Sequence, residues 1–445
     1  MNQETIYDAR TLGAPKMLLL GLQHMFAMFG ATVLVPAITG LSISATLLFA
    51  GLGTLLFHLI TGRKVPAFLG SSFAFLGAYG LVTASGTDIP LTYSCFGVAC
   101  AGLLYLVLAL LFKIFGAQKV MRFFPPIVTG PVIIAIGLTL SQSAIDNCAN
   151  NWIVALVAIL VVIYFNIWGK GMLKIIPILL GVIASYAVSM IIDAPTRQTL
   201  IEHVSDAAWV GLPVKWNNTA LSIFGEGFDG GMLITTVITI MPIALATMVE
   251  HIGDICAISS TVGKNFVADP GLHRTLTGDG IATTIAALFG APANTTYGEN
   301  TGVLALSKVY DPRVIRLAAV FAAVLSFCPK FAAVIAAMPA ATMGGVSLVL
   351  YGMISAVGVR NVVENQVDFT KSRNVIIAAL ILVLSIGIKY SAAGSILIPI
   401  GSITISLSGL AIAAIVGIVL NAALPGKDYT FQKDDEGSTS VNFKV

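Results

Sequence analysis

Charged side chains are scarce in this chain, since Asp, Glu, Lys and Arg together make up only 10% of its 445 residues. A soluble globular domain carries about 25% charged residues, so the shortage excludes an ordinary soluble domain. Hydrophobic residues reach 57%, and the mean hydropathy is +0.93. This composition indicates a protein that crosses a lipid bilayer many times, and nothing in it suggests binding to nucleic acid.

Cysteine is also rare, with five residues at positions 95, 100, 148, 256 and 328. Their spacing matches no metal-binding motif, so we expect neither a metal ion nor a cofactor. The first sixteen residues are polar, and the first apolar run is too long for the hydrophobic part of a cleavable signal peptide. We therefore expect no such signal.

The hydrophobic residues are grouped into fourteen runs. At about 20 residues per spanning helix, the chain has room for about 12 to 14 spans. The runs lie near residues 18–38, 45–61, 66–84, 91–114, 127–145, 152–168, 174–192, 232–258, 275–290, 291–307, 313–337, 339–358, 373–388 and 403–424. The predicted fold class is an all-α polytopic membrane protein with fourteen transmembrane segments.

Lysine and arginine indicate the orientation, because they accumulate on cytoplasmic loops. With the amino terminus inside, 20 of the 24 basic residues fall on cytoplasmic connections or tails. Both termini are therefore expected in the cytoplasm, as tails of residues 1–16 and 425–445. The longest connection, residues 193–231, is expected outside the membrane as a solvated acidic loop.

The third and tenth runs contain polar residues that a lipid-facing helix would not carry. Residues 291–308 include a carboxylate, two asparagines, two glycines and a proline. Irregular backbone at membrane depth is tolerated only where it is buried in protein or lines a cavity. We therefore predict a short extended strand followed by a half-helix in segments 3 and 10.

The two halves of the chain contain a weak repeat, carried by three pairs of matching stretches. The offsets are 227, 226 and 214 residues for 23–24 with 250–251, 65–67 with 291–293, and 124–132 with 338–346. Seven spans per half is an odd number, so the second half is inverted relative to the first. Inverted repeats with paired broken helices are typical of secondary transporters, and the solute binds between the two breaks.

Few ionisable residues lie inside the apolar runs. Glu250 and Asp254 are four residues apart and project from one face of a helix, while Glu299 follows the tenth break. The alternative for each carboxylate is a structural hydrogen-bond acceptor between helices. Half-helices that begin near Phe73 and Gly298 would point backbone N–H groups at the same place. Carboxylate acceptors, backbone donors and an aromatic face suit a flat ring such as a pyrimidine or purine base.

Several stretches resemble one known family, the nucleobase–ascorbate (nucleobase–cation symporter 2) transporters, and especially its bacterial uracil permeases. They run through both halves and are LQHMFAMFGATVLVP (22–36), VPAFLGSSFAF (65–75), EHIGD (250–254), NTTYGEN (294–300) and MGGVSLVLYG (343–352). The family motif with Asn300, Gly302 and Lys308 is also present, with Ser307 in place of its usual threonine.

The resemblance implies a seven-plus-seven inverted repeat divided into two domains. A core domain of residues 17–115 and 232–338 would hold the base, and a gate domain of residues 116–192 and 339–424 would face it. It also implies a homodimer through the gate domain and a location in the plasma (inner) membrane of a bacterium.

The resemblance further implies the binding residues. Glu250 and Glu299 would accept the uracil N–H groups, while the backbone at Phe73 and Gly298 would donate to its carbonyls. The remaining implied wall residues are Ala31, Ser72, Tyr297 and Tyr351, with Gln23, His24, His251 and Asn300 in support.

The expected function is import of uracil in symport with a proton, by alternating access of core against gate. Glu250, Asp254 and Glu299 are the candidate proton carriers, because burial disfavours a charged carboxylate. The resemblance implies histidine at the position where this chain has Asp254, so a carboxylate pair at 250 and 254 would take the place of a histidine-based proton step. The alternatives are a xanthine or urate permease of the same family, an anion exchanger of related fold, and an intramembrane enzyme, which no Ser/His pair or metal motif supports.

Overall fold

The structure is a computed structural model that describes residues 5–80, 88–225, 227–400 and 403–427. The side chains of Glu299 and of residues 399–405 also lie outside the description. The end of the third predicted segment, at residues 81–84, and most of the predicted carboxyl-terminal tail therefore lie outside the described residues.

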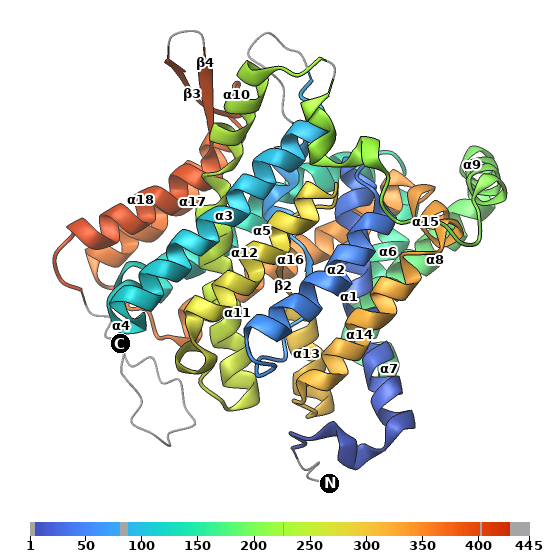
Figure 1. Ribbon diagram of the computed structural model, residues 1–445, viewed down its shortest axis with the longest axis horizontal. Helices are drawn as coiled ribbons and strands as arrows, with labels where there is room; N and C mark the ends of the chain where they lie inside the picture. Colours follow the sequence, from blue (N-terminus) through green and yellow to red (C-terminus); the bar gives the residue numbers. More distant parts are fainter. Residues whose placement is uncertain (1–4, 81–87, 226, 401–402, 428–445) are drawn as a thin grey trace.

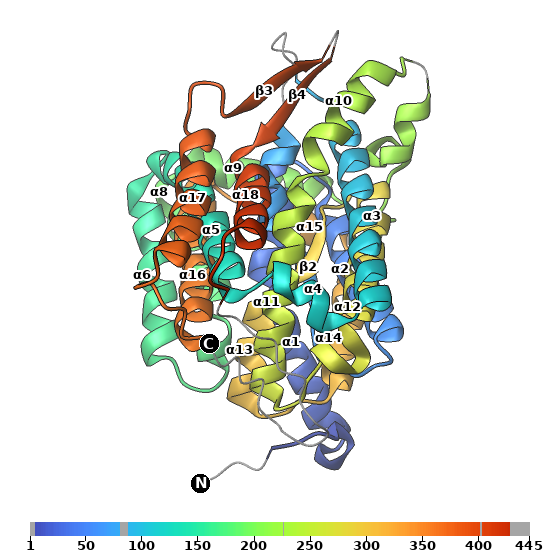
Figure 2. The same cartoon turned by 90° about the vertical axis from the view of Figure 1, so that its left-hand side faces the viewer.

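Helices dominate the described chain, and most of them run along the long direction of the molecule in Figure 2. In the first half they are α1 (Ala14–Thr39), α2 (Ile43–Ile60), α3 (Leu91–Phe115), α4 (Ala117–Val120), α5 (Pro126–Ala149), α6 (Trp152–Trp168), α7 (Met172–Ile175), α8 (Pro177–Ile192) and α9 (Ala194–Asp206). In the second half they are α10 (Gly230–Ile240), α11 (Ile243–Val262), α12 (Leu272–Leu288), α13 (Gly298–Ser307), α14 (Pro312–Leu325), α15 (Pro329–Ala336), α16 (Ala340–Glu364), α17 (Ser372–Lys389) and α18 (Gly409–Ala423).

Seven of these helical segments are long and apolar enough to cross a membrane, counting α10 and α11 together. Two further pairs, α8 with α9 and α14 with α15, pass the same criteria together but bend by 113° and 88°, which raises the number to nine. The apolar helices α6 and α18 are shorter. The chain is thus a mostly helical, polytopic membrane protein.

Two short strands, one from each half of the chain, lie side by side. β1 (Leu69–Ser71) pairs antiparallel with β2 (Asn294–Thr296), so that Leu69 lies opposite Thr296. β1 leads into the 3-10 helix η2 (Phe73–Gly80), and β2 leads into α13. The predicted strand and half-helix breaks in segments 3 and 10 are confirmed.

Threonine hydroxyl groups hold both strands in place. Thr54 of α2 accepts a hydrogen bond from the Leu69 N–H (2.9 Å) and donates to the Leu69 carbonyl (3.3 Å). Thr283 of α12 does the same for Asn294, at 3.2 Å and 3.0 Å. Each side chain is buried, so these contacts satisfy strand groups that no water reaches.

The prediction of a fourteenth span at residues 403–424 is wrong at its start. β4 (Ile403–Ser408) pairs with β3 (Ser395–Ile400) in a hairpin, and α18 begins only at Gly409. Residues 403–408 alternate apolar and hydroxyl side chains, a period of two that favours a strand. The hairpin projects beyond the helices at the upper end of Figure 1, so the fold is not purely helical.

Two other predicted segments differ from the structure. The loop expected at residues 193–231 contains α9, and the predicted span 313–337 breaks into α14 and α15 around Cys328. Pro329 occupies the first position of α15, where its missing N–H costs nothing and its fixed backbone angle favours a new helix start.

The helices pack in two groups. α5 packs on α16, α6 on α8, and α17 on α18 in one group, while α3 packs on α12, α2 on α12 and α14, and α1 on α14 in the other. The β1–β2 strand pair belongs with the second group, through contacts with α1, α2, α11 and α12. This arrangement places both half-helices where the two groups meet.

Candidate functional site

A cavity of about 280 Å³ lies between the two helix groups, next to the β1–β2 strand pair. One wall comes from α1, η2, α11, β2 and α13, and the other from α5, α6, α7, the first turn of α8 and α16. Its exposed rim includes Lys174 and Leu306. Figure 1 shows α7 and α13, the elements nearest this rim, at the lower end of the molecule, where the described chain begins.

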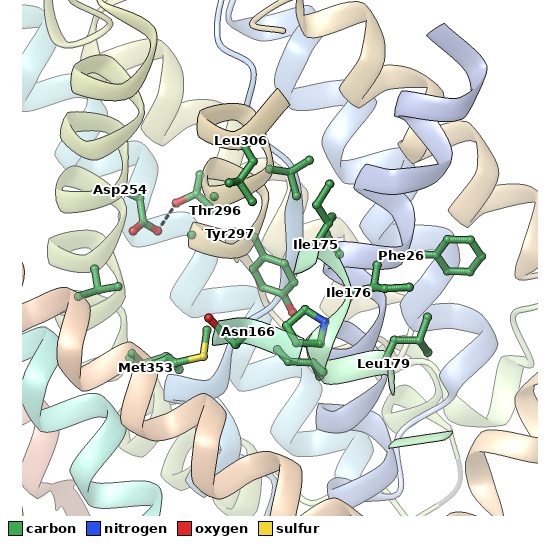
Figure 3. A pocket seen from close by; sticks show the side chains of 18 of the residues that line it. Phe26, Asn166, Ile175, Ile176, Leu179, Asp254, Thr296, Tyr297, Leu306 and Met353 are labelled. Carbon is green, nitrogen blue, oxygen red and sulfur yellow. Dashed lines mark hydrogen bonds between the residues drawn. The ribbon is translucent and has the colours of Figure 1, made fainter. Parts of the chain in front are cut away.

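Two carboxylates of α11 line the cavity, Glu250 and Asp254. Thr296 of β2 donates a hydrogen bond from its hydroxyl to Asp254 Oδ2 at 2.7 Å, and the Asp254 residue is only 9% exposed. Figure 3 shows this contact at one side of the cavity. The four-residue spacing predicted from the sequence therefore brings both carboxylates to one face of α11.

His251 points to the other side of α11, away from the cavity. Its Nδ1 lies 2.8 Å from Asp279 Oδ2 of α12, and both side chains are fully buried. This contact joins two helices of the same group. The predicted supporting role of His251 stays a prediction, and Asp279 is its partner on α12.

The amino terminus of α13 meets the cavity at Gly298. The first N–H groups of a helix have no partner within the helix, and they carry a positive partial charge. Glu299 follows on α13, with its side chain outside the description. A methyl group at Gly298 would have no atom within 4 Å, so the backbone here is open to a solute.

Aromatic rings form two further surfaces. Tyr297 lines the cavity with its ring, while its hydroxyl donates to the Ser71 carbonyl at 3.0 Å. Phe73 lines the cavity and meets the buried ring of Tyr351 edge-on, with centroids 5.6 Å apart and planes at 73°. Tyr351 belongs to α16, so the ring pair closes the space between η2 and the facing helix group.

The other predicted residues do not line this cavity. Ala31 and Ser72 are buried behind it, and the Ser72 N–H donates to the Ala293 carbonyl at 2.8 Å. Gln23 is only half-buried on α1. Asn300 Nδ2 lies 3.2 Å from His24 Nδ1 and donates to the His24 carbonyl at 3.1 Å. This last pair joins α13 to α1 and so fixes the half-helix beside the cavity.

The sequence did not predict the residues on the facing wall. They are Ile133, Asn166, Lys174, Ile175, Ile176, Pro177, Ile178, Leu179, Met353, Ile354 and Val357, and Phe26, Ala27, Thr295 and Thr296 were missed on the near wall. Figure 3 shows Asn166 and Met353 below the Asp254–Thr296 contact, with Phe26 on the opposite side of the view. Asn166, a lone amide in an apolar run, was the one available signal.

The arrangement offers a small solute two kinds of polar contact within mostly apolar walls. Carboxylate oxygens accept hydrogen bonds, and the helix terminus at Gly298 donates them. Among the described residues, no group of three or more His, Cys, Asp or Glu side chains could hold a metal ion. The site can therefore hold a flat solute that is both a hydrogen-bond donor and an acceptor.

The chain matches the family model described as "Permease family" over residues 15–394. It is 40% identical over 417 residues to the probable uracil permease of Haemophilus influenzae, covering 91% of this chain and 94% of that protein. It is 40% identical over 432 residues to the uracil permease of Bacillus caldolyticus, covering 95% and 94%.

Solved structures show a related fold at low sequence identity. The transmembrane domain of the cyanobacterium bicarbonate transporter BicA aligns with a TM-score of 0.57 and 14% identity, covering 94% of this chain and 99% of that one. The structure of SLC26A9 aligns with a TM-score of 0.60 and 14% identity, covering 94% of this chain and 66% of that one. At this identity the likeness concerns the fold alone.

Proposed function

The chain belongs to the permease family of nucleobase–ascorbate transporters, which makes it a transporter rather than an enzyme, and we propose that it imports uracil together with a proton. The uracil permeases that it matches at 40% identity carry that base in their names. The observation that carries the proposal is the meeting of Glu250, Phe73 and the start of α13 in one cavity.

Uracil fits the chemistry of this cavity. Its ring N–H groups need acceptors, which Glu250 and Glu299 would supply, and its carbonyls need donors, which the backbone at Gly298 and Phe73 would supply. Phe73 and Tyr297 would cover the flat faces of the ring. The carboxylates would repel an anion that cannot lose its charge. The fold shared with anion carriers therefore does not imply an anionic substrate for this chain.

The proton is proposed to bind at the carboxylates of the cavity. Glu250 and Asp254 line the same cavity, and Glu299 follows Gly298 of its wall in the sequence. Carboxylates that share a poorly hydrated site resist joint ionisation. A proton entering from the acidic side would lower the charge that the core domain carries across the membrane. Its release on the other side would accompany release of the base.

An inverted repeat of fourteen segments is the proposed framework for this movement. In this repeat α1, α3, α5, α6 and α8 would correspond to α10–α11, α14, α16, α17 and α18. Contacts between helices that recur for corresponding elements support it, since α3 packs on α10 as α14 packs on α1, and α6 packs on α16 as α17 packs on α5. The pair α1 and α8 recurs in the same way as α11 and α18. Residues 17–115 and 232–338 would form the core, and residues 116–192 and 339–424 the gate.

The crossing of α5 and α16 supports the same symmetry at the level of residues. A methyl group on Gly130 would press on the Gly358 carbonyl and on Val362. A methyl group on Gly344 would press on the Ala144 carbonyl and on the Cys148 backbone. Each of these contacts is related to the other by the 214-residue offset between Gly130 and Gly344.

Alternating access is proposed to work across the Phe73–Tyr351 contact. The cavity with Glu250 lies on one side of this contact. A second cavity, of about 400 Å³, is lined on another side of η2 by Ala74 and Gly77, together with α5 and the β3–β4 hairpin. With both termini in the cytoplasm, the first cavity would open inward and the second outward. Movement of core against gate would exchange their access to the carboxylates.

Uptake of labelled uracil into proteoliposomes tests the proposal. We expect uptake to require an inward acid gradient and to be unaffected by unlabelled xanthine. Glu250→Gln should abolish it, because the amide places a donor opposite a ring N–H, whereas Glu202→Gln, on the exposed helix α9, serves as a matched control. Strong competition by xanthine would instead assign the protein to the purine carriers, and gradient-independent uptake would reject proton symport.

From its membership of the family, the protein is further proposed to form a homodimer in the plasma membrane of a bacterium. Cross-linking in native membranes tests the dimer, and a species of monomer mass alone would reject it.

A further inference from the structure

A second, entirely apolar groove lies on the outside of the helix bundle. Its volume is about 600 Å³, and no polar atom is exposed on its wall. One side is a stripe of α3 at helical spacing, and the residues of this stripe are Leu104, Val107, Leu108, Leu111 and Phe115. We call it the α3 groove.

The floor and the far side of the α3 groove come from other elements. Leu245 and Met248 of α11 form the floor, and Ile418 of α18 contributes to the far side. The connection after α3 adds Val120, Phe123 and Phe124, from α4, from the 3-10 helix η3 (Met121–Phe123) and from the residue after it. The groove therefore bridges α3 and α11 on one side and α18 on the other.

The groove is open along its length. Val107 is 56% exposed and Phe115 is 53% exposed at the rim, whereas Met248 on the floor is only 3% exposed. A membrane protein meets hydrocarbon at such a surface, and an apolar channel of this volume matches a lipid chain rather than a polar solute.

The end of the groove is basic. Lys119 is itself a lining residue, and Arg122 lies exposed three residues after it in the sequence. Within the described part of the chain, no carboxylate forms an ion pair with either of them, in contrast to Lys64, which lies 2.6 Å from Asp269. A lysine without an acidic partner at the end of an apolar groove complements an anionic headgroup above an acyl chain.

We propose that the α3 groove binds one anionic phospholipid, with an acyl chain against α3 and α11 and its phosphate at Lys119 and Arg122. Binding of this lipid does not depend on the substrate. A consequence for transport rests on the proposed function, because α3 and α11 would belong to the core and α18 to the gate. A lipid held between them would change the ease with which the two domains move.

Native mass spectrometry of the purified protein tests the lipid site without any transport assay. Protein incubated with phosphatidylglycerol should retain one lipid, and Lys119→Gln should weaken retention about fivefold, the contribution of one basic residue beside an anionic surface. Lys170→Gln, an exposed lysine outside the groove, is the matched control. Val107→Trp, which fills the groove, should remove the bound lipid while the protein keeps its melting temperature.

Equal retention by wild type, Lys119→Gln and Val107→Trp would overturn the proposal. Loss of a dimer in Val107→Trp would also overturn it and would assign the groove to contact with a second copy of the chain. In vesicles, we expect phosphatidylglycerol to change the rate of wild-type uptake and to leave Lys119→Gln unaffected. Lipid retention without any uracil uptake would reject the proposed substrate and leave the lipid site standing.

Discussion

The hydroxyl of Thr296 donates a hydrogen bond to a carboxylate of the cavity, and its oxygen lies 2.7 Å from Asp254 Oδ2. Thr296→Val removes this donor from a carboxylate that is almost fully buried. Hydrogen bonds to charged groups contribute about 1.5–3 kcal/mol, so we expect initial uracil uptake to fall at least about tenfold. Uptake rates measured over a range of external pH check this.

Thr296→Ser provides the matched control, since it keeps the hydroxyl at the same position. It should retain most of the wild-type rate. Wild-type uptake by Thr296→Val at every pH would show that the hydrogen bond has no part in transport and that Asp254 is held by other contacts.

Among residues, the sequence predicted the cavity wall formed by η2, α11 and α13 better than the facing wall formed by α5, α16 and the chain from α6 to α8. Glu250, Asp254 and Gly298 were found because ionisable and flexible residues are conspicuous beside a break in an apolar run. Thr296 was missed because threonine is an ordinary strand residue. Lys174 and its neighbours come from a connection between helices, and no periodicity relates that connection to the breaks.

Among elements, the two strands depend on threonines of the helices before them. Thr54→Val should leave the Leu69 N–H buried without an acceptor, and Thr283→Val should do the same to Asn294. Each unsatisfied group costs about 1–3 kcal/mol. We expect a lower melting temperature in detergent and loss of uracil uptake for both variants, whereas Thr54→Ser and Thr283→Ser should resemble wild type. A Val variant with wild-type melting would mean that another group, or water, satisfies the strand.

The first described residues form a strap across the ends of three elements. Ile6 exchanges backbone hydrogen bonds with Lys308 (2.9 Å) and Tyr310 (2.8 Å), after α13. The Tyr7 hydroxyl donates to the Val262 carbonyl at the end of α11 (2.8 Å), and Arg313 of α14 lies 2.9 Å from Asp8. The sequence predicted only a polar tail here, because contacts between distant parts of a chain leave no local pattern.

The strap should respond to acid through Asp8. Hydrogen bonds from Arg10 lower the pKa of this carboxyl from 3.8 to about 2. A lowered folded-state pKa means that the contribution is complete above about 3.8 and is lost as the pH falls through about 2. A spin label at Thr5→Cys should stay immobile from neutral pH down to about pH 4 and gain mobility towards about pH 2.

Asp8→Asn should make the same label mobile already at neutral pH, because the charge that holds Arg313 is gone. Asp206→Asn, at the end of α9 and far along the chain, is the control. A label that stays immobile in Asp8→Asn would mean that the backbone bonds of Ile6 hold the strap without the ion pair.

The predicted elements failed where the prediction rested on average hydropathy. Residues 403–408 are hydrophobic enough for a span, but their alternation specifies strand β4. The break between α14 and α15 has a clear cause in Pro329, yet a proline inside an apolar run is equally compatible with a kinked helix. Local patterns identify the elements, and tertiary packing decides where they end.

For the whole molecule, the paired breaks were predictable, because polar residues and glycines stand out in an otherwise apolar run. The inverted repeat stays a prediction. The resting conformation was not predictable. No residue pattern states which side of a moving cavity is open. The exposed rim at Lys174 and Leu306 supplies that information only once the chain is folded.

The orientation of the chain in the membrane decides to which side of the membrane this rim opens. If both termini are cytoplasmic, as the 20 of 24 basic residues on that side predict, the cavity with Glu250 opens to the cytoplasm. In a cysteine-free background, a membrane-impermeant thiol reagent should label Asn217→Cys in intact cells. It should label Leu306→Cys, whose native side chain is 47% exposed, and Lys427→Cys only in inverted vesicles.

Uracil should protect Leu306→Cys but not Lys427→Cys, since only the former lies at the cavity. Labelling of Lys427→Cys from outside would reverse the orientation and turn the cavity with Glu250 into the outward one. Labelling of Leu306→Cys from both sides, with Lys427→Cys labelled from inside alone, would mean that the protein visits both conformations at rest. The structure would then represent one of two populated states, and the Phe73–Tyr351 contact would be the one that opens between them.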